Sequence, residues 1–408
     1  MVHVNLTRLR NDLETLGNIG SIPEGGVWRS SFSEADMEAR RWYLGRLEES
    51  TLQHWVDAAG NIYARVGDGS PAVIAGSHLD SVPNGGRFDG ALGVIAALEC
   101  LRSIQELGVR TKLPIEAVAF TDEEGRFGGF IGSFAVIGTM TYEEVLRRRD
   151  LHDMPLADAM RLVGLDPRRI GDAQRHPKDV KAYVELHIEQ GPILESMAVP
   201  IGVVQGIVAG SRTWITFGGR ADHAGTTPMA MRKDAFLGAA DFGLRAREMV
   251  LTEGSGTTVG TVGVVDLKPG ASNIVPETAF LTLDLRDMSW DVLQRLLRRV
   301  DGLAHEVAAN WGLDVTVERM RVSEPAQMSP SIQAVIDAAA RGLGHKTHWM
   351  NSGAGHDAQV MAKITDTGMI FVPSRNGRSH SPAEFTDWDQ VENGANVLLN
   401  TLLQLANG

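Results

Sequence analysis

A histidine and two aspartates gather around a glycine-rich turn within residues 73–93 and could bind a metal ion. Residues 73–75 form a short apolar run that suits a parallel strand buried on both faces, and His78 follows just past its predicted end. Asp80 is placed to accept the second ring N–H of that imidazole and fix its tautomer. Asp89 returns toward His78 after a flexible Asn-Gly-Gly turn. The simpler alternative is that His78 and Asp80 form an ordinary hydrogen-bonded pair in a loop.

Adjacent carboxylates follow the next predicted strand, at residues 115–120. The sequence Thr-Asp-Glu-Glu-Gly at 121–125 includes Glu123 and Glu124. Two such carboxylates could divide the work of hydrolysis, one binding a metal and the other holding the proton of an attacking water. A solvated acidic loop is the structural alternative for this segment.

Two further histidines, His187 and His380, follow predicted strands at residues 180–186 and 369–372. A single histidine in such a place is usually a hydrogen-bonded neighbour, but ligands gather outside the carboxyl ends of strands in open α/β sheets. Mixed histidine and carboxylate ligands suit divalent ions, and the absence of a cysteine pair excludes a zinc-thiolate site. We therefore expect these segments to converge on a catalytic centre with two divalent ions.

The elements around these residues predict the α/β class, with a doubly wound mixed sheet in a catalytic domain. A helix at residues 91–107 lies between two predicted buried strands, as in a βαβ unit. From about residue 210 the order becomes β-α-β-β-α-β, which is the ferredoxin-like arrangement. The predicted domains are therefore residues 1–209 and 328–408 for the catalytic domain, and 210–327 for an inserted α+β domain.

The composition limits the classes of partner and the cellular compartment that we expect. The chain has 408 residues and a net charge of −12, which argues against nucleic acid and anionic membranes as partners. The single cysteine, Cys100, cannot form an internal disulfide and suits a reducing compartment. The first residues lack the apolar region of a signal peptide, and no run approaches the ~18 apolar residues of a membrane span. We expect a cytoplasmic enzyme with a small-molecule substrate.

A series of motifs resembles the hydantoinase/carbamoylase amidases. This group contains N-carbamoyl-L-amino acid hydrolases, allantoate amidohydrolases and β-ureidopropionases, within a larger superfamily of di-metal aminoacylases and exopeptidases. The similarity runs from about residue 5 to the carboxyl end. The motifs are Gly-Ser-His-Leu-Asp-Ser (76–81), Gly-Arg-Phe-Asp-Gly (86–90), Thr-Asp-Glu-Glu-Gly (121–125), Glu-Leu-His-Ile-Glu-Gln-Gly-Pro (185–192), Ala-Asp-His-Ala-Gly-Thr-Thr-Pro-Met (221–229), Ser-Gly-Ala-Gly-His-Asp (352–357) and Ser-His-Ser-Pro-Ala-Glu (379–384).

The resemblance implies a ligand set for two ions of zinc, manganese, cobalt or nickel. His78 and His187 would bind one ion, Glu124 and His380 would bind the other, and Asp89 would bridge them. These are expectations carried over motif by motif.

The same resemblance implies roles for groups around the ions. Glu123 would act as general base and then as general acid, while His223 and Asn273 would polarise the scissile carbonyl. Arg286 would bind the substrate carboxylate, and Gln190 would contact the ureido or amide group. The inserted domain would serve as a lid and as the dimerisation domain of a homodimer.

Each of these roles in the inserted domain has a structural alternative. Arg286 could simply pair with Asp284 or Asp287, His223 could be a loop histidine, and Asn273 could be a turn residue. In addition, the stretch between Gly125 and Ile-Gly-Ser at 131–133 is shorter than in typical relatives, which affects the predicted fit of substrate.

We therefore predict hydrolysis of the C–N bond of an N-carbamoyl-L-amino acid to the amino acid, ammonia and carbon dioxide. The alternatives are allantoate or another ureide as substrate, and then a metal-dependent exopeptidase. A binding protein without activity is disfavoured, because Glu123 would serve no purpose beside an intact ligand set.

Overall fold

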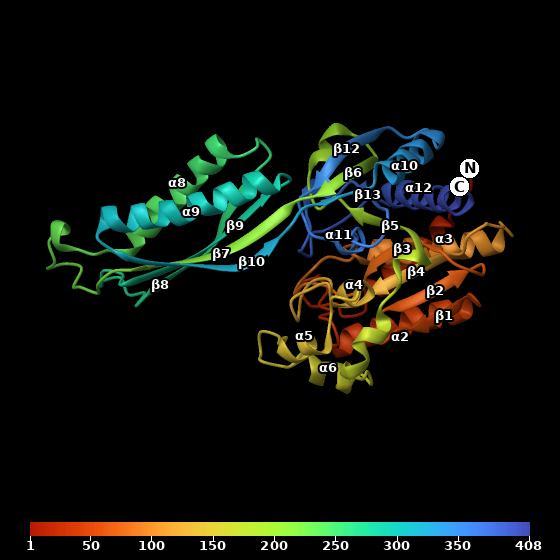
Figure 1. Cartoon of the computed structure of the whole chain (residues 1–408), viewed down its shortest axis with the longest axis horizontal. Coiled ribbons are helices and arrows are strands. Elements are labelled where there is room, and N and C mark those ends of the chain that lie inside the picture. The colour runs from red at the N-terminus through yellow and green to blue at the C-terminus, as the bar shows by residue number, and fades with distance from the viewer. The chain divides into compact units, whose positions relative to one another are not determined.

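The chain folds into two compact units. The computed structural model describes residues 1–408, except for the side chain of Arg321. One unit combines Met1–Gln205 with Gln327–Gly408, and the other is Gly206–Ala326 (Figure 1). The sequence placed the limits of the inserted domain at residues 210 and 327, and its role as lid and dimerisation domain stays a prediction.

The first unit is built on a nine-stranded mixed sheet, which confirms the predicted fold class. The strand order is β1-β2-β4-β3-β5-β13-β6-β11, with β12 paired to β6. The central strands β4, β3, β5 and β13 run parallel, whereas the outer pairs β1/β2, β2/β4 and β13/β6 are antiparallel. The strands are β1 (Gln53–Val56), β2 (Ile62–Val66), β3 (Ala72–His78), β4 (Ile115–Phe120), β5 (Val180–Ile188), β6 (Ile201–Ile207), β11 (Ala326–Gln327), β12 (Thr347–Ser352) and β13 (Thr367–Val372).

Helices bury the apolar sheet in two hydrophobic cores. Helices α1 (Leu6–Leu16), α2 (Glu34–Glu49), α3 (Ala91–Glu106), α10 (Pro330–Gly342) and α12 (Trp388–Asn407) share the larger core with the sheet. A smaller core joins α4 (Ile131–Val136), α5 (Tyr142–Arg147) and α6 (Leu156–Leu162). The remaining helices are α7 (Ile193–Met197) and α11 (Asp357–Met361). In the part of the chain that the structure describes, no helix combines the length and apolar character needed to cross a membrane.

Some predicted element ends were wrong, for local physical reasons. His78 is the last residue of β3, and His187 lies inside β5 rather than past its end. The ladder continues there because His187 pairs with Phe371 of the neighbouring strand β13. Helix α6 begins at Leu156, directly after Pro155, because a proline disfavours helical geometry in the residue before it.

The second unit has the predicted ferredoxin-like topology. Its antiparallel sheet has the order β10-β7-β9-β8, and residues on β9 alternate between buried and partly exposed. Helices α8 and α9 form one core with the sheet and lie on the same side of it (Figure 1). The elements are β7 (Ala209–Gly218), α8 (Ala235–Glu253), β8 (Val259–Lys268), β9 (Thr278–Asp287), α9 (Trp290–Trp311) and β10 (Asp314–Ser323).

Close packing of α3 against the sheet places the loop that carries Asp89. A Cβ atom on Gly93, in the first turn of α3, would lie 2.6 Å from the backbone oxygen of Leu186 and 2.7 Å from the Ser77 Cβ. Asp89 and Gly90 immediately precede this turn, and Gly90 has a φ of 64°. The absence of a side chain at Gly93 therefore fixes how near Asp89 comes to the ends of β3 and β5.

We expect Gly93→Ala to destabilise the protein by about 1–3 kcal/mol, because a backbone oxygen cannot move aside for the added methyl group. The matched control is Gly45→Ala in the middle of α2, where nothing lies within 4 Å of the added Cβ. That control should stabilise by about 0.5–1 kcal/mol through helix propensity. Urea unfolding of both variants measures the difference, and equal shifts would contradict the packing argument.

Candidate metal centre

Side chains from four segments of the first unit lie close together beside the carboxyl ends of its parallel strands. Groups of three ligand atoms, all within 4.8 Å of one another, can be drawn from them. These side chains are the six that the sequence singled out as ligands or base: His78, Asp89, Glu123, Glu124, His187 and His380. The structure thus brings the predicted ligand set together, while the role of each residue stays a prediction.

Asp89 lies at the centre and faces two sets of ligands. Its Oδ1 is 3.1 Å from His187 Nε2 and 3.7 Å from His78 Nε2. Its Oδ2 is 3.2 Å from His380 Nε2, which is in turn 3.7 Å from Glu124 Oε2. The groups His78, Asp89, His187 and Asp89, Glu124, His380 therefore share only Asp89. This is the arrangement that a carboxylate bridging two cations requires, with one oxygen for each.

Backbone carbonyls fix the tautomers of the two buried histidines. His78 Nδ1 is 3.0 Å from the backbone oxygen of Asp80, and His187 Nδ1 is 2.8 Å from that of Ile188. Because a carbonyl can only accept, each Nδ1 carries a proton, and the Nε2 atom of each ring faces Asp89. The expectation that the Asp80 carboxylate accepts the His78 N–H was wrong, since Oδ1 lies 3.8 Å from Nδ1.

The Asp80 carboxylate instead holds the loop that carries both glutamates. Its two oxygens accept hydrogen bonds from the backbone N–H groups of Glu123, at 3.3 Å, and Glu124, at 3.2 Å. The chain turns sharply just before them, where Asp122 has a φ of 55°. Asp80 therefore supports the site through the backbone and is already engaged by two donors.

The buried carboxylates carry more negative charge than the protein around them neutralises. Burial, reinforced by Glu124, raises the pKa of Glu123 well above its usual range. Burial also raises the pKa of Glu124, with Asp89 adding to the effect, and that of Asp80 to about 7. The Glu124 Oε1 atom is buried without a hydrogen-bond partner among the described residues. This donor set and its unpartnered oxygen fit divalent cations.

Asp89 is the exception, because its carboxylate is surrounded by imidazoles. Burial alone would raise the pKa of Asp89, but hydrogen bonds from His187 and His380 hold it well below its usual range. The charged form of this carboxylate is therefore favoured at neutral pH. A permanently charged Asp89 suits the position between two cations.

The sequence assigned no role to Glu384, although it supports Asp89 directly. This carboxylate is 4% exposed and accepts the N–H groups of Phe88, at 2.8 Å, and Asp89, at 3.0 Å. The Ser379 hydroxyl lies 2.8 Å from Glu384 Oε2 and 2.9 Å from Asp89 Oδ2. A Cβ on Gly86 would overlap the Glu384 carboxyl carbon at 1.9 Å. Motif 379–384 was the only available signal, because the contacting residues are almost 300 positions apart.

A second acidic residue that the sequence did not single out, Glu185, lies behind His187. Glu185 and His356 form a further group with His187, whose ring centroid is 4.5 Å from that of His356. However, the Glu185 carboxylate already accepts the Ser77 hydroxyl at 2.7 Å and the Ala358 N–H at 2.9 Å. Glu185 therefore supports the surroundings of His187 and is not free to bind a third ion.

Gln190 contacts the proposed bridging ligand. Its Nε2 donates to Asp89 Oδ2 at 2.7 Å, and its backbone φ is 58°. Its buried Oε1 has no hydrogen-bond partner within the described part of the chain. The side chain thus keeps one acceptor available, and its predicted contact with a ureido group stays a prediction.

In the second unit, the segments that carry His223 and Asn273 lie side by side. The N–H of Ala224 donates to the Asn273 backbone oxygen at 3.0 Å, and His223 pairs with Ile274. His223 Nδ1 accepts the Gly225 N–H at 3.0 Å. The proton of the neutral ring is therefore on Nε2, which makes exposed His223 a hydrogen-bond donor, as the predicted role requires.

Arg286 forms an ion pair with Asp284, which was the structural alternative to binding the substrate carboxylate. Its Nε donates to Asp284 Oδ1 at 2.8 Å. The Arg286 side chain is nevertheless 39% exposed, so the pair does not bury it. Its predicted role in carboxylate binding stays a prediction.

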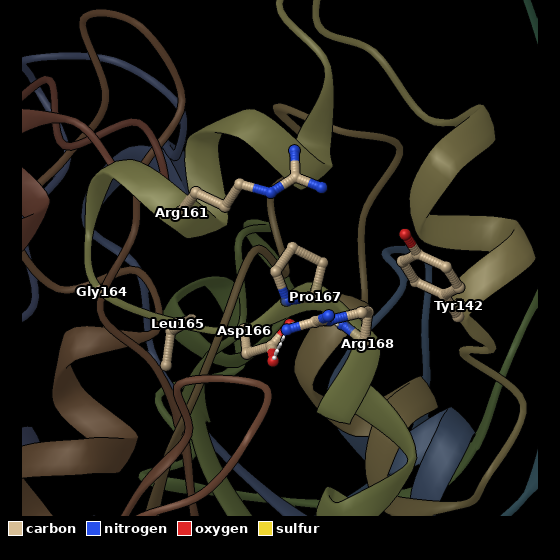
Figure 2. A pocket seen from close by; sticks show the side chains of 7 residues that line it. All are labelled: Tyr142, Arg161, Gly164, Leu165, Asp166, Pro167 and Arg168. Carbon is tan, nitrogen blue, oxygen red and sulfur yellow. Dashed lines mark hydrogen bonds and ion pairs between the residues drawn. The ribbon is translucent and has the colours of Figure 1, made fainter.

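One cavity in the first unit has no connection to this chemistry. It has a volume of about 510 Å³ and is lined by Tyr142, two arginines and Asp166 among others (Figure 2). Figure 2 shows Arg168 paired with Asp166, and the second arginine, Arg161, pairs with Asp158 at 2.6 Å. Both cations are therefore already neutralised, and none of the candidate ligands lines the cavity.

We expect Glu384→Gln to weaken binding of zinc by about 10- to 100-fold, because the uncharged amide holds the Asp89 loop and Ser379 less firmly. Competition with a chromophoric chelator measures this affinity without any substrate. Glu48→Gln, an exposed position on α2, is the control and should bind zinc as the native protein does. Unchanged affinity in Glu384→Gln would show that this support is dispensable.

Comparison with known proteins identifies the family. The model of peptidase family M20/M25/M40 matches residues 74–404. An N-carbamoyl-L-amino acid amidohydrolase of Geobacillus stearothermophilus is 43% identical, with 98% of each chain covered. A ureidoglycolate hydrolase of Oryza sativa subsp. japonica is 34% identical, covering 99% of this chain and 85% of its own.

A solved structure agrees over the whole length. The crystal structure of a hydantoinase/carbamoylase family amidase from Burkholderia multivorans has a TM-score of 0.91 and 35% identity, with 100% of this chain and 99% of that chain covered. The sequence match and the structural match thus cover both units. The chain therefore belongs to peptidase family M20/M25/M40 and, within it, to the hydantoinase/carbamoylase amidases, which are metal-dependent hydrolases.

Proposed function

We propose that the protein hydrolyses N-carbamoyl-L-amino acids with one water to the amino acid, ammonia and carbon dioxide. The observation that carries the proposal is the geometry of Asp89, whose two oxygens face two ligand groups, with Glu123 beside one of them. The substrate class rests on the names of relatives, three of which are N-carbamoyl-L-amino acid amidohydrolases at 36–43% identity.

Two divalent ions per subunit are part of this proposal, and zinc, manganese, cobalt and nickel all suit the ligands. His78 and His187 would hold one ion and Glu124 and His380 the other, with Asp89 shared. When bound, such ions would polarise the scissile carbonyl and make water more acidic. They would also neutralise the buried carboxylates, whose charge is otherwise unbalanced.

Glu123 would transfer the proton during hydrolysis. Its Oε2 lies 3.5 Å from His78 Nε2, and the resemblance assigns it no ion to bind. Glu123 Oε2 would take a proton from the attacking water and pass it to the leaving nitrogen, so that one carboxylate acts first as base and then as acid. The environment that raises its pKa makes it a stronger base than an exposed glutamate.

The remaining groups would bind and orient the substrate. The Nε2–H of His223 and the amide of Asn273 would stabilise the developing oxyanion. Arg286 would bind the carboxylate, and Gln190 Oε1 would accept a hydrogen bond from a ureido N–H. We further propose a cytoplasmic homodimer that associates through the second unit, as the resemblance implies.

A ureide such as ureidoglycolate or allantoate is the second candidate substrate. Relatives from Oryza sativa subsp. japonica and Arabidopsis thaliana are ureidoglycolate hydrolases at 33–34% identity, and another is a probable allantoate deiminase. The same ligand groups and Glu123 would serve either reaction, since both hydrolyse a linear C–N bond.

The substrate class is tested by release of ammonia and amino acid from a panel of compounds. We expect turnover of N-carbamoyl-L-amino acids, with much slower turnover of the D-enantiomers, allantoate, ureidoglycolate and dipeptides. A chelator should abolish all turnover, and an added divalent ion should restore it. Cleavage of dipeptides without cleavage of any ureide would overturn the proposal.

We expect Glu123→Gln to reduce kcat by roughly 10²- to 10⁴-fold, because the amide cannot accept the proton of water. Its metal content, measured by elemental analysis, should stay near that of the native protein, because Glu123 is not an assigned ligand. Loss of metal together with activity would instead make Glu123 a ligand, and unchanged kcat would remove it from the mechanism.

A further inference from the structure

A cavity of about 860 Å³ in the first unit adjoins the metal centre. Asp80 and Glu124 line its inner end. Its other walls come from the segment 28–38, which leads into α2, and from residues 150–152. The sequence assigned no chemistry to either segment. A group inside this cavity would lie directly beside the proposed metal ligand Glu124.

Arg126 ties the two outer segments of the cavity together. Its guanidinium group donates to Asp150 Oδ2 at 3.1 Å and to the Ser31 backbone oxygen at 2.7 Å. Asp150 also accepts the backbone N–H groups of His152 and Met154, at 2.9 and 3.0 Å. The walls are therefore held in place, and the charge of Arg126 is used within the protein.

The rim of the cavity is apolar and exposed. Leu151 is fully accessible and Trp28 is 51% exposed, although large apolar side chains are usually buried. The Trp28 indole N–H is already satisfied by the Ser30 hydroxyl at 2.9 Å. Phe32 continues the apolar surface toward the interior. The groups left to contact a ligand are the face of the Trp28 ring and the aliphatic side chain of Leu151.

The same rim carries negative charge. Glu34 and Glu38 line the cavity from the first turns of α2, and both are exposed. Neither forms an ion pair with any residue that the structure describes. Their charge therefore acts on whatever enters, repelling an anionic group and attracting a cationic one.

From this geometry we infer that the cavity binds the side chain of the amino acid substrate and selects large side chains that are uncharged or cationic. The inference rests on the proposed function and adds to it the class of amino acid. The volume lies within the range of small-molecule sites. The cavity adjoins Glu124, so a side chain could enter it while the carbamoyl group stays at the ligands. Gly125 and Arg126, which follow the two glutamates, form part of the wall.

The selection for size is tested with Trp28→Ala and Leu151→Ala. The substrates are N-carbamoyl-L-tryptophan and N-carbamoylglycine, which has no side chain. We expect each variant to lower the ratio of kcat/KM for the two substrates by roughly tenfold, because a large side chain loses its apolar contacts. Leu162→Ala, which removes an exposed leucine outside the cavity, is the matched control and should keep the native ratio.

The selection for charge is tested with Glu38→Gln. We expect this variant to raise kcat/KM for N-carbamoyl-L-aspartate relative to N-carbamoyl-L-lysine by roughly threefold or more, as removal of one surface charge permits. Glu48→Gln, on the same helix but outside the cavity, should leave this ratio unchanged. Calorimetric titration of the same ligands into a Glu123→Gln background separates binding from turnover.

The outcomes distinguish the two proposals. If the native protein cleaves N-carbamoyl-L-amino acids but the cavity variants change all substrates by one factor, the cavity does not bind the side chain and the proposed function stands. If the native protein cleaves no N-carbamoyl-L-amino acid, the proposed function and this inference both fail. Selective loss of large substrates in Trp28→Ala and Leu151→Ala supports the inference.

Discussion

The structure depends on keeping several carboxylates buried together around Asp89. Like charges in a protein interior repel one another strongly, because little solvent screens them. Burial raises the pKa values of Glu123 and Glu124, and neighbouring carboxylates add to the rise, whereas hydrogen bonds from His187 and His380 lower the pKa of Asp89 despite its burial. Divalent cations resolve this excess of negative charge, so the same electrostatic constraint explains both the dependence of the family on metal and the choice of ligands.

The fold supplies the means of holding these charges in place. Parallel strands β3, β4 and β5 bring separate segments to one edge of the sheet. Hydrogen bonds from backbone N–H groups then hold the loops of these segments in position. Asp80 holds the loop of both glutamates through two N–H groups, and Glu384 holds the Asp89 loop in the same way. Carboxylates outside the predicted ligand set therefore orient the predicted ligands, which is a common property of metal sites.

The residues with predicted roles differ in exposure between the two units. The first unit carries the candidate ligands, the predicted general base Glu123 and the cavity beside Glu124. The second unit presents His223 and Arg286 on exposed segments, with the protonated Nε2 of His223 available as a donor. Most of the predicted ligands are thus buried in the first unit, whereas the predicted contacts with the substrate carbonyl and carboxylate come from more accessible side chains of the second unit.

The sequence alone determined the fold class, the family and the identities of the six side chains that cluster, because strand-end motifs are local patterns of residue types. It did not determine that the backbone oxygen of Asp80 fixes His78, since that depends on which oxygen of Asp80 the local backbone directs toward the ring. Only the tertiary structure placed Glu384 against Asp89 and residues 150–152 beside Glu124. Such contacts join segments far apart in the chain, and their partners follow from packing rather than from any local pattern.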